Sequence, residues 1–138
     1  MEETRAPQLI SVHEGYARFA PAGPGTVGSL AAVLEHVMQE CQTFAQTRLL
    51  VNVRSLDFPS LSAVDRYELS ETVAGFWDRS ILLAMVARAD QIDPERFGQK
   101  VAVNRGLFVA VFTDEVPAVE WLRSRRTVGL SRSPPRPD

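Results

Sequence analysis

The sequence predicts an α/β domain. An N-terminal β-hairpin is followed by successive right-handed β-α units, giving a mixed, mostly parallel sheet of about five strands with four helices. Two apolar runs, 81–87 (ILLAMVA) and 107–112 (LFVAVF), lack the polar alternation of half-exposed strands and are typical of strands covered on both faces. Segments with the three-to-four-residue apolar spacing of helices precede them. This alternation favours parallel strands joined by crossover helices.

The length and composition indicate the general class of protein. At 138 residues, with 45% hydrophobic and 23% charged residues, the chain has the size and composition of one globular domain. Its net charge of -2 favours neither nucleic acid nor an anionic membrane as a partner. Cys41 is the only cysteine, which excludes an intrachain disulfide and a cysteine-based zinc site. No long apolar run or signal-peptide layout appears, so we expect a cytoplasmic protein without membrane insertion.

The first elements are a hairpin and a helix. Strands are expected at 9–14 and 16–19, with Gly15 supplying the positive φ of a tight turn. Residues 1–7 are expected to be a flexible terminus. A helix is expected over 26–45, where Thr26 or Ser29 can cap the start. Its apolar residues recur at the spacing of one buried helical face: Val27, Leu30, Ala31, Leu34, Val37, Met38, Cys41 and Phe44.

The central strand, 49–53, leads through a Pro- and Ser-containing loop into a helix expected over 62–77. Ser62 and Asp65 resemble a capping box at its start. A third helix is expected over 93–105, with Asp93 as N-cap and Gly106 as the left-handed residue after its end. The last helix is expected over 114–124. One domain therefore spans 8–124, and the Arg-, Pro- and Ser-rich segment 125–138 is expected to be a disordered tail.

A sheet wound sequentially in one hand would carry its helices on one face. The other face of the last two strands would then be an apolar patch that needs a cover, either a helix that crosses to it or a second subunit. The second alternative predicts a homodimer through a face formed by Leu82, Val86, Phe108 and Phe112.

No catalytic or metal-binding motif is found. His13 and His36 share no metal-ligand or catalytic spacing, and no zinc-protease, phosphate-loop or serine-hydrolase motif appears. Cys41 falls on an apolar helical stripe, which predicts an inert buried thiol. We therefore predict no catalytic residues, no metal and no cofactor.

The carboxyl ends of parallel strands are where open α/β sheets meet ligands and partners. Here that edge would carry the loop after the central strand, then 88–93 and 113–114. A phosphate on a serine near the next helix N-terminus would be stabilised there, although helix capping also explains the serines. The candidate partner-binding or regulatory residues are Arg54, Asp57, Ser60 and Ser62.

Three stretches, LLVNVRSL (49–56), DRYELSE (65–71) and AVEWL (118–122), follow the hairpin in an order that resembles the STAS superfamily. This is the fold of bacterial anti-sigma-factor antagonists, and the chain is most similar to small bacterial STAS-like proteins. The resemblance covers roughly residues 8–124. It implies a non-enzymatic interaction and signalling module with a regulatory protein partner. In the antagonists a loop serine is phosphorylated; here Ser60 or Ser62 would occupy that place, although the loop lacks the Asp-Ser-x-Gly pattern.

Two other functions remain open. The related CRAL-TRIO branch of the fold buries an apolar ligand beneath its helices, which suggests a small lipophilic-ligand carrier with a pocket between the second helix and the sheet. Tyr67, Phe76 and Trp77 would then line the pocket. An enzyme is the third alternative, and it would require a site assembled between subunits.

Overall fold

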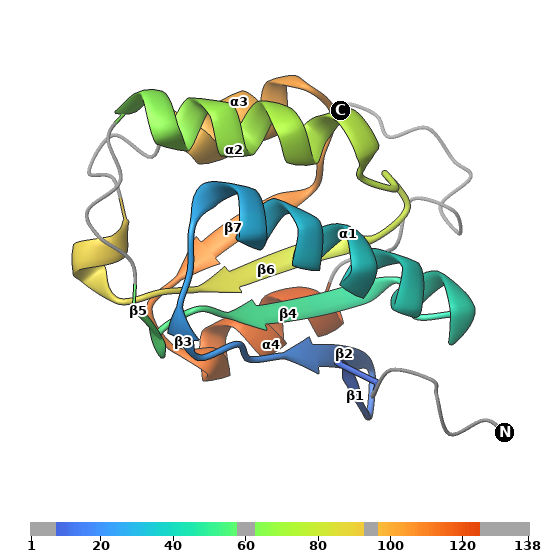
Figure 1. The fold of residues 1–138 in the computed structure, drawn as a ribbon. Coiled ribbons are helices and arrows are strands. Elements are labelled where there is room, and N and C mark those ends of the chain that lie inside the picture. Colours follow the sequence, from blue (N-terminus) through green and yellow to red (C-terminus); the bar gives the residue numbers. More distant parts are fainter. Residues whose placement is uncertain (1–7, 58–62, 93–96, 125–138) are drawn as a thin grey trace, which may run out of the picture.

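A computed structural model of the chain describes residues 8–57, 63–92 and 97–124. Its main sheet has five strands in the order β1-β2-β4-β6-β7 (Figure 1). The strands are β1 (Ser11–His13), β2 (Tyr16–Phe19), β4 (Arg48–Asn52), β6 (Leu82–Val86) and β7 (Val109–Phe112). The α/β class and the mostly parallel sheet predicted from the sequence are confirmed.

Strand directions follow from the connections. β1 and β2 form the antiparallel hairpin, and Gly15 between them has a φ of +89°, the conformation for which glycine was expected. The remaining neighbours are parallel, with Val51 of β4 opposite Met85 of β6. The mixed sheet therefore has its antiparallel strand at one edge, as predicted.

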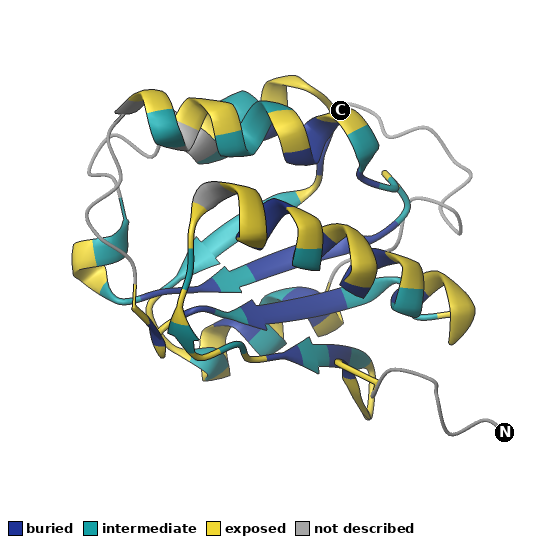
Figure 2. Ribbon diagram, in the orientation of Figure 1, coloured by how far each residue is buried: buried dark blue, intermediate teal, exposed yellow. Residues whose placement is uncertain are grey.

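Three helices cover one face of the sheet: α1 (Val27–Thr43), α2 (Ala63–Phe76) and α3 (Phe97–Asn104) (Figures 1 and 2). Alternate strand residues such as Leu49, Val51 and Leu83 point into the core beneath them. Thr26 is the N-cap of α1 and forms a reciprocal capping box with Ser29, which satisfies two free N–H groups of the first turn.

The fourth helix, α4 (Glu115–Ser124), lies on the opposite face. Ala118 and Leu122 pack there on Leu50, Leu82 and Val86. Of the two covers considered for the second face, a crossing helix or a second subunit, the crossing helix is confirmed. The handedness rule constrains helices that connect two parallel strands, and α4 follows the last strand, so it is free to cross.

This crossing also corrects the proposed dimer face. Leu82 and Val86 are 1% and 0% exposed, because α4 covers them within the same chain. A second subunit therefore has no access to these two residues. Phe112 is half-buried against Trp121, and only Phe108, at 42% exposure, remains largely open.

Three small elements were not predicted. β3 (Gly23–Pro24) and β5 (Leu56–Asp57) form a separate two-stranded parallel sheet, and a short 3-10 helix, η2, spans Ala89–Gln91. Gly106 has a φ of +91°, as expected for the residue that ends α3. The expected flexible terminus, the Asp93 cap, Ser60, Ser62 and the tail 125–138 lie outside the described residues. Within the described ranges, no helix combines the length and the apolar character needed to span a bilayer.

Candidate functional site: the loop after the central strand

The central strand ends in a tight loop, here called the edge loop (residues 53–57). The amide of Val53 still donates to the carbonyl of Val86 in the neighbouring strand, at 2.8 Å. The chain then turns, with the Leu56 amide donating to the Val53 carbonyl at 3.0 Å. The side-chain oxygen of Asn52 accepts from the Arg54 amide at 2.9 Å. These bonds fix the backbone of the loop where the sheet ends.

One side of the edge loop is bound to the segment that precedes α1. The Gly23 amide donates to the Ser55 carbonyl at 3.2 Å, and β3 pairs with β5 directly beside it. Gly23 adopts a φ of +89°, which side chains other than glycine rarely tolerate. The glycine- and proline-rich residues 21–25 (PAGPG) therefore fix this side of the loop.

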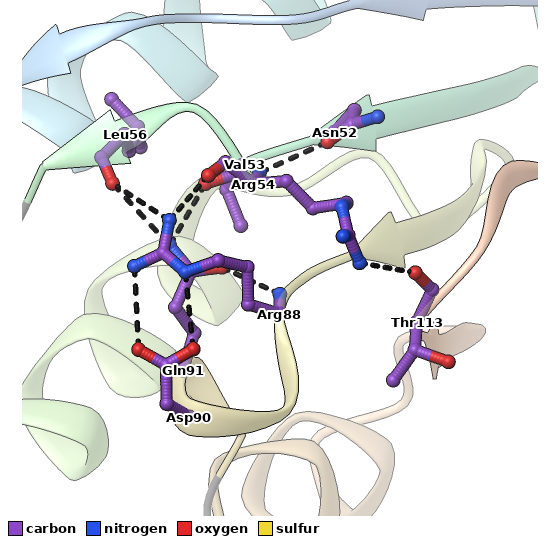
Figure 3. A network of polar contacts seen from close by, with 8 residues as sticks. All are labelled: Asn52, Val53, Arg54, Leu56, Arg88, Asp90, Gln91 and Thr113. Carbon is purple, nitrogen blue, oxygen red and sulfur yellow. Dashed lines mark hydrogen bonds and ion pairs between the residues drawn. The ribbon is translucent and has the colours of Figure 1, made fainter.

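The other side is held by two long polar side chains from the segment after β6 (Figure 3). The Arg88 guanidinium donates through Nη1 to the carbonyl oxygens of Arg54 and Leu56. The Gln91 side-chain amide donates to the Val53 carbonyl at 2.9 Å, and its oxygen accepts from the Arg88 amide at 2.7 Å. Arg88 and Gln91 therefore hydrogen-bond to three carbonyl groups of the edge loop.

Asp90 completes this network. Its carboxylate accepts from Arg88 Nε at 3.0 Å, and this hydrogen bond lowers the pKa of Asp90 below its usual value. The Asp90 side chain is 73% exposed, so the ion pair lies in solvent and orients Arg88 more than it adds stability.

The predicted residues Arg54 and Asp57 are both exposed at this edge. Arg54 extends across it and donates from Nη1 to the carbonyl of Thr113 at 2.7 Å, where β7 leads into α4 (Figure 3). The structure therefore connects the loops after β4, β6 and β7, as the topology predicted. Ser60 and Ser62 cannot be placed relative to this site because they lie outside the described residues.

A second polar cluster lies where β4 ends on the α4 side. Glu115, in the first turn of α4, accepts from Arg18 Nη2 at 2.7 Å and from the Asn52 side-chain amide at 2.6 Å. The Arg18 hydrogen bond is the main cause of a lowered Glu115 pKa, and the Asn52 bond adds to it, whereas partial burial opposes both. This cluster fixes α4 to the sheet.

Sequence reasoning placed 88–93 at this edge but missed what Arg88 and Gln91 do, and it missed Glu115 entirely. Long side chains that hydrogen-bond to backbone carbonyls far away in the chain produce no periodic pattern in the sequence. The sequence shows only that Arg88 and Gln91 are polar and closely follow a buried apolar strand, and this is the one feature that could have pointed to them.

The other candidate groups have ordinary contacts. His36 lies 3.2 Å from the Glu40 carboxylate on the outer side of α1, and His13 stacks on Tyr16 with 5.1 Å between ring centroids. Cys41 is fully buried, as predicted, and burial raises its thiol pKa to about 12. In the described part of the chain, no group of three or more His, Cys, Asp or Glu residues is arranged to hold a metal ion.

A partly open cavity of about 170 Å³ lies on the opposite side of the sheet from α4. It is situated between the α2–α3 pair and strands β6 and β7. The sequence suggested a pocket near Tyr67, Phe76 and Trp77, but the lining residues from α2 are Leu69, Ser70 and Val73. Tyr67 is 43% exposed instead, and Trp77 is buried in the core with its indole N–H donating to the Ile81 carbonyl.

Compared with family models and with curated proteins, the sequence shows no match to either.

Proposed function

We propose that this chain is a non-enzymatic, STAS-like interaction module that binds a regulatory protein partner in the cytoplasm. The contact surface, here called the edge surface, consists of Arg54, Ser55, Asp57, Asp90 and Thr113, five exposed residues of the three connected loops. The order of elements supports the STAS-like assignment, because a hairpin is followed by alternating helices and parallel strands.

The observation that carries this proposal is the bracing of the edge loop from two sides. β3 holds it on one side, and Arg88 with Gln91 holds it on the other. A loop needed only to connect β4 to α2 would not require contacts from two separate segments of the chain. A loop fixed before binding loses less conformational entropy when a partner binds, which favours affinity.

The kind of group that makes these contacts also supports the proposal. The bracing contacts use backbone groups of the edge loop, whereas the side chains of Arg54, Ser55 and Asp57 remain exposed. The loop thus presents a cation, a hydroxyl and a carboxylate from a fixed backbone. A loop that is held through its backbone and leaves its side chains exposed is typical of binding loops on rigid scaffolds.

Regulation would act on the same surface. Following the STAS-like resemblance, we propose that phosphorylation of Ser60 or Ser62, which follow Asp57 closely in the chain, switches partner choice. A phosphate adds nearly two negative charges and strong hydrogen-bond acceptors to the chain segment that follows Asp57. It would repel a partner that recognises Arg54 and favour one with its own cationic groups.

The test begins by isolating the partner from the native host with the tagged full chain and reconstituting the pair from purified proteins. Dissociation constants are then measured by calorimetry for the wild type, Arg54→Ala, Asp57→Ala and Ser60→Asp. Each substitution is expected to weaken binding at least tenfold, because Arg54→Ala and Asp57→Ala each remove a charged group of the edge surface and Ser60→Asp adds a negative charge that repels a partner recognising Arg54.

Glu35→Ala is the matched control, since Glu35 is an exposed carboxylate on α1 with no role in the edge surface. It should leave the dissociation constant unchanged. Unchanged affinity in both Arg54→Ala and Asp57→Ala would show that the edge loop is only a connection.

A further inference from the structure

The cavity between the α2–α3 pair and the sheet is independent of the edge surface. Its described lining comes from five elements, α1, α2, β6, α3 and β7, and from Leu107, two residues before β7. α2 packs against α1 and α3, so helices cover one side of the cavity and strands of the sheet form the other. The residues are Leu34, Leu69, Ser70, Val73, Leu83, Met85, Gln99, Ala102, Leu107, Val109 and Val111.

The lining is almost wholly apolar. Ser70 and Gln99 are the only polar side chains among the described lining residues, and both already have interaction partners. Gln99, for example, donates to the Val109 carbonyl at 3.4 Å. A water molecule needs two to four polar partners to be held in a cavity, and this lining offers few. The chemistry therefore favours an apolar occupant.

The volume of the cavity narrows the range of possible ligands further. A volume of about 170 Å³ is well below the roughly 300–1,000 Å³ of sites for drug-sized ligands. It is close to the roughly 150 Å³ of an engineered apolar cavity that binds benzene. A single six-membered aromatic ring therefore matches the cavity in size, whereas a long lipid chain would extend beyond it through its opening.

Two features of the lining indicate the chemistry of the ligand. Met85 lies in the floor, and its polarizable thioether favours contact with an aromatic ring. The described lining contains no charged side chain, so an ionised group would lose its hydration without gaining a counter-charge.

We propose that this cavity binds a neutral, compact apolar molecule of the size of a monocyclic aromatic hydrocarbon. The sequence suggested a carrier of a small lipophilic ligand. The cavity restricts that hypothesis to a compact ligand bound between α2, α3, β6 and β7. It does not depend on the edge surface, so either can fail without affecting the other.

The test uses benzene as the probe and the full chain with labelled methyl groups, observed by NMR. Benzene should cause saturable shifts of methyl signals from lining residues such as Leu69, Val73 and Val109. Phenol should bind at least tenfold more weakly, because burying its hydroxyl here leaves that group without a strong partner.

Ala102→Leu fills the cavity and should abolish the benzene-induced shifts. Val103→Leu is the matched control: Val103 is the next residue on α3, is 48% exposed and does not line the cavity, so binding should persist. If Ala102→Leu does not fold, Val111→Ile serves in its place with a smaller volume change. Absence of saturable shifts in the folded wild type, or equal shifts in the filled variant, would overturn the proposal.

Discussion

Arg88 donates a hydrogen bond from its guanidinium to the backbone carbonyl of Arg54, so a residue after one strand fixes the loop after its neighbour. The backbone amide of Arg88 is in turn held by Gln91, which also binds the Val53 carbonyl. This arrangement makes the edge loop a rigid part of the sheet edge. The proposed partner surface depends on that rigidity.

Replacing Arg88 with methionine keeps the aliphatic stem and removes every guanidinium hydrogen bond. We expect the free energy of unfolding to fall by about 1–2 kcal/mol, since hydrogen bonds from a charged donor are lost at a partly exposed site. Amide hydrogen exchange should accelerate at Leu56, whose N–H donates within the loop. Urea denaturation and exchange mass spectrometry measure the two effects.

Asp90→Asn is the control for this variant, because it weakens the exposed ion pair and leaves the carbonyl contacts of Arg88 in place. Exchange at Leu56 should then stay near the wild-type rate. If Arg88→Met exchanges no faster than wild type, the guanidinium does not hold the loop.

Glu115→Gln should make stability less dependent on acid pH. The hydrogen bonds of Glu115 with Arg18 and Asn52 lower its pKa in the folded state from 4.5. Its contribution is therefore complete above the unfolded-state pKa and is lost as the pH falls through the lower folded-state value. We expect the variant to be less stable by about 1 kcal/mol at pH 7, with the gap closing below about pH 4.5.

Denaturant titrations at several pH values between neutral and acid test this expectation. Glu120→Gln, an exposed position on the same helix, should change stability by less than about 0.5 kcal/mol throughout. A stability gap for Glu115→Gln that stays constant across the pH range would contradict the assigned ion pair.

Leu122→Ala tests whether α4 covers the second face of the sheet. Leu122 is 0% exposed and packs with Leu50 and Leu82, so truncation should cost about 3 kcal/mol through lost burial and the cavity left behind. Val116→Ala, at a position 69% exposed on the same helix, should cost less than about 0.5 kcal/mol. A cost below about 1 kcal/mol for Leu122→Ala, measured by chemical denaturation, would argue against this packing.

Ala45→Gly should stabilise the protein. Ala45 follows the C-cap of α1 with a φ of 57°, a left-handed conformation that costs a non-glycine residue about 1–2 kcal/mol. Glycine removes this cost, but its greater flexibility in the unfolded chain offsets part of the gain. We therefore expect the free energy of unfolding to rise by about 0.5–1 kcal/mol. Ala32→Gly, exposed within α1, should instead destabilise by about 1 kcal/mol. Thermal denaturation giving the same sign for both would contradict this assignment.

Much of the fold was predictable because its signals are local. The apolar run 81–87 identified a strand covered on both faces, and α1 was marked by its apolar stripe and by Thr26 at its start. The side on which α4 packs was not predictable, since no crossover rule applies to a helix after the last strand. β3 and β5 have two residues each, too short to leave a pattern.

The candidate site was predictable only in outline. Arg54 and Asp57 could be placed at the sheet edge because parallel strands end there together. The roles of Arg88 and Gln91 depend on contacts with residues more than thirty positions away, as in the Arg88–Arg54 contact, and no local pattern encodes them. The cavity lining could not be predicted because it depends on the exact packing of α2 and α3 over the strands.

The most direct test of the central claim is hydrogen–deuterium exchange of the full chain with and without its purified protein partner. We expect binding to slow exchange across residues 53–57 and 88–91, while the exposed side of α1 around Glu35 is unaffected. Protection confined to other surfaces, with the edge loop exchanging at its free rate, would contradict the assignment of the edge surface as the partner-binding site.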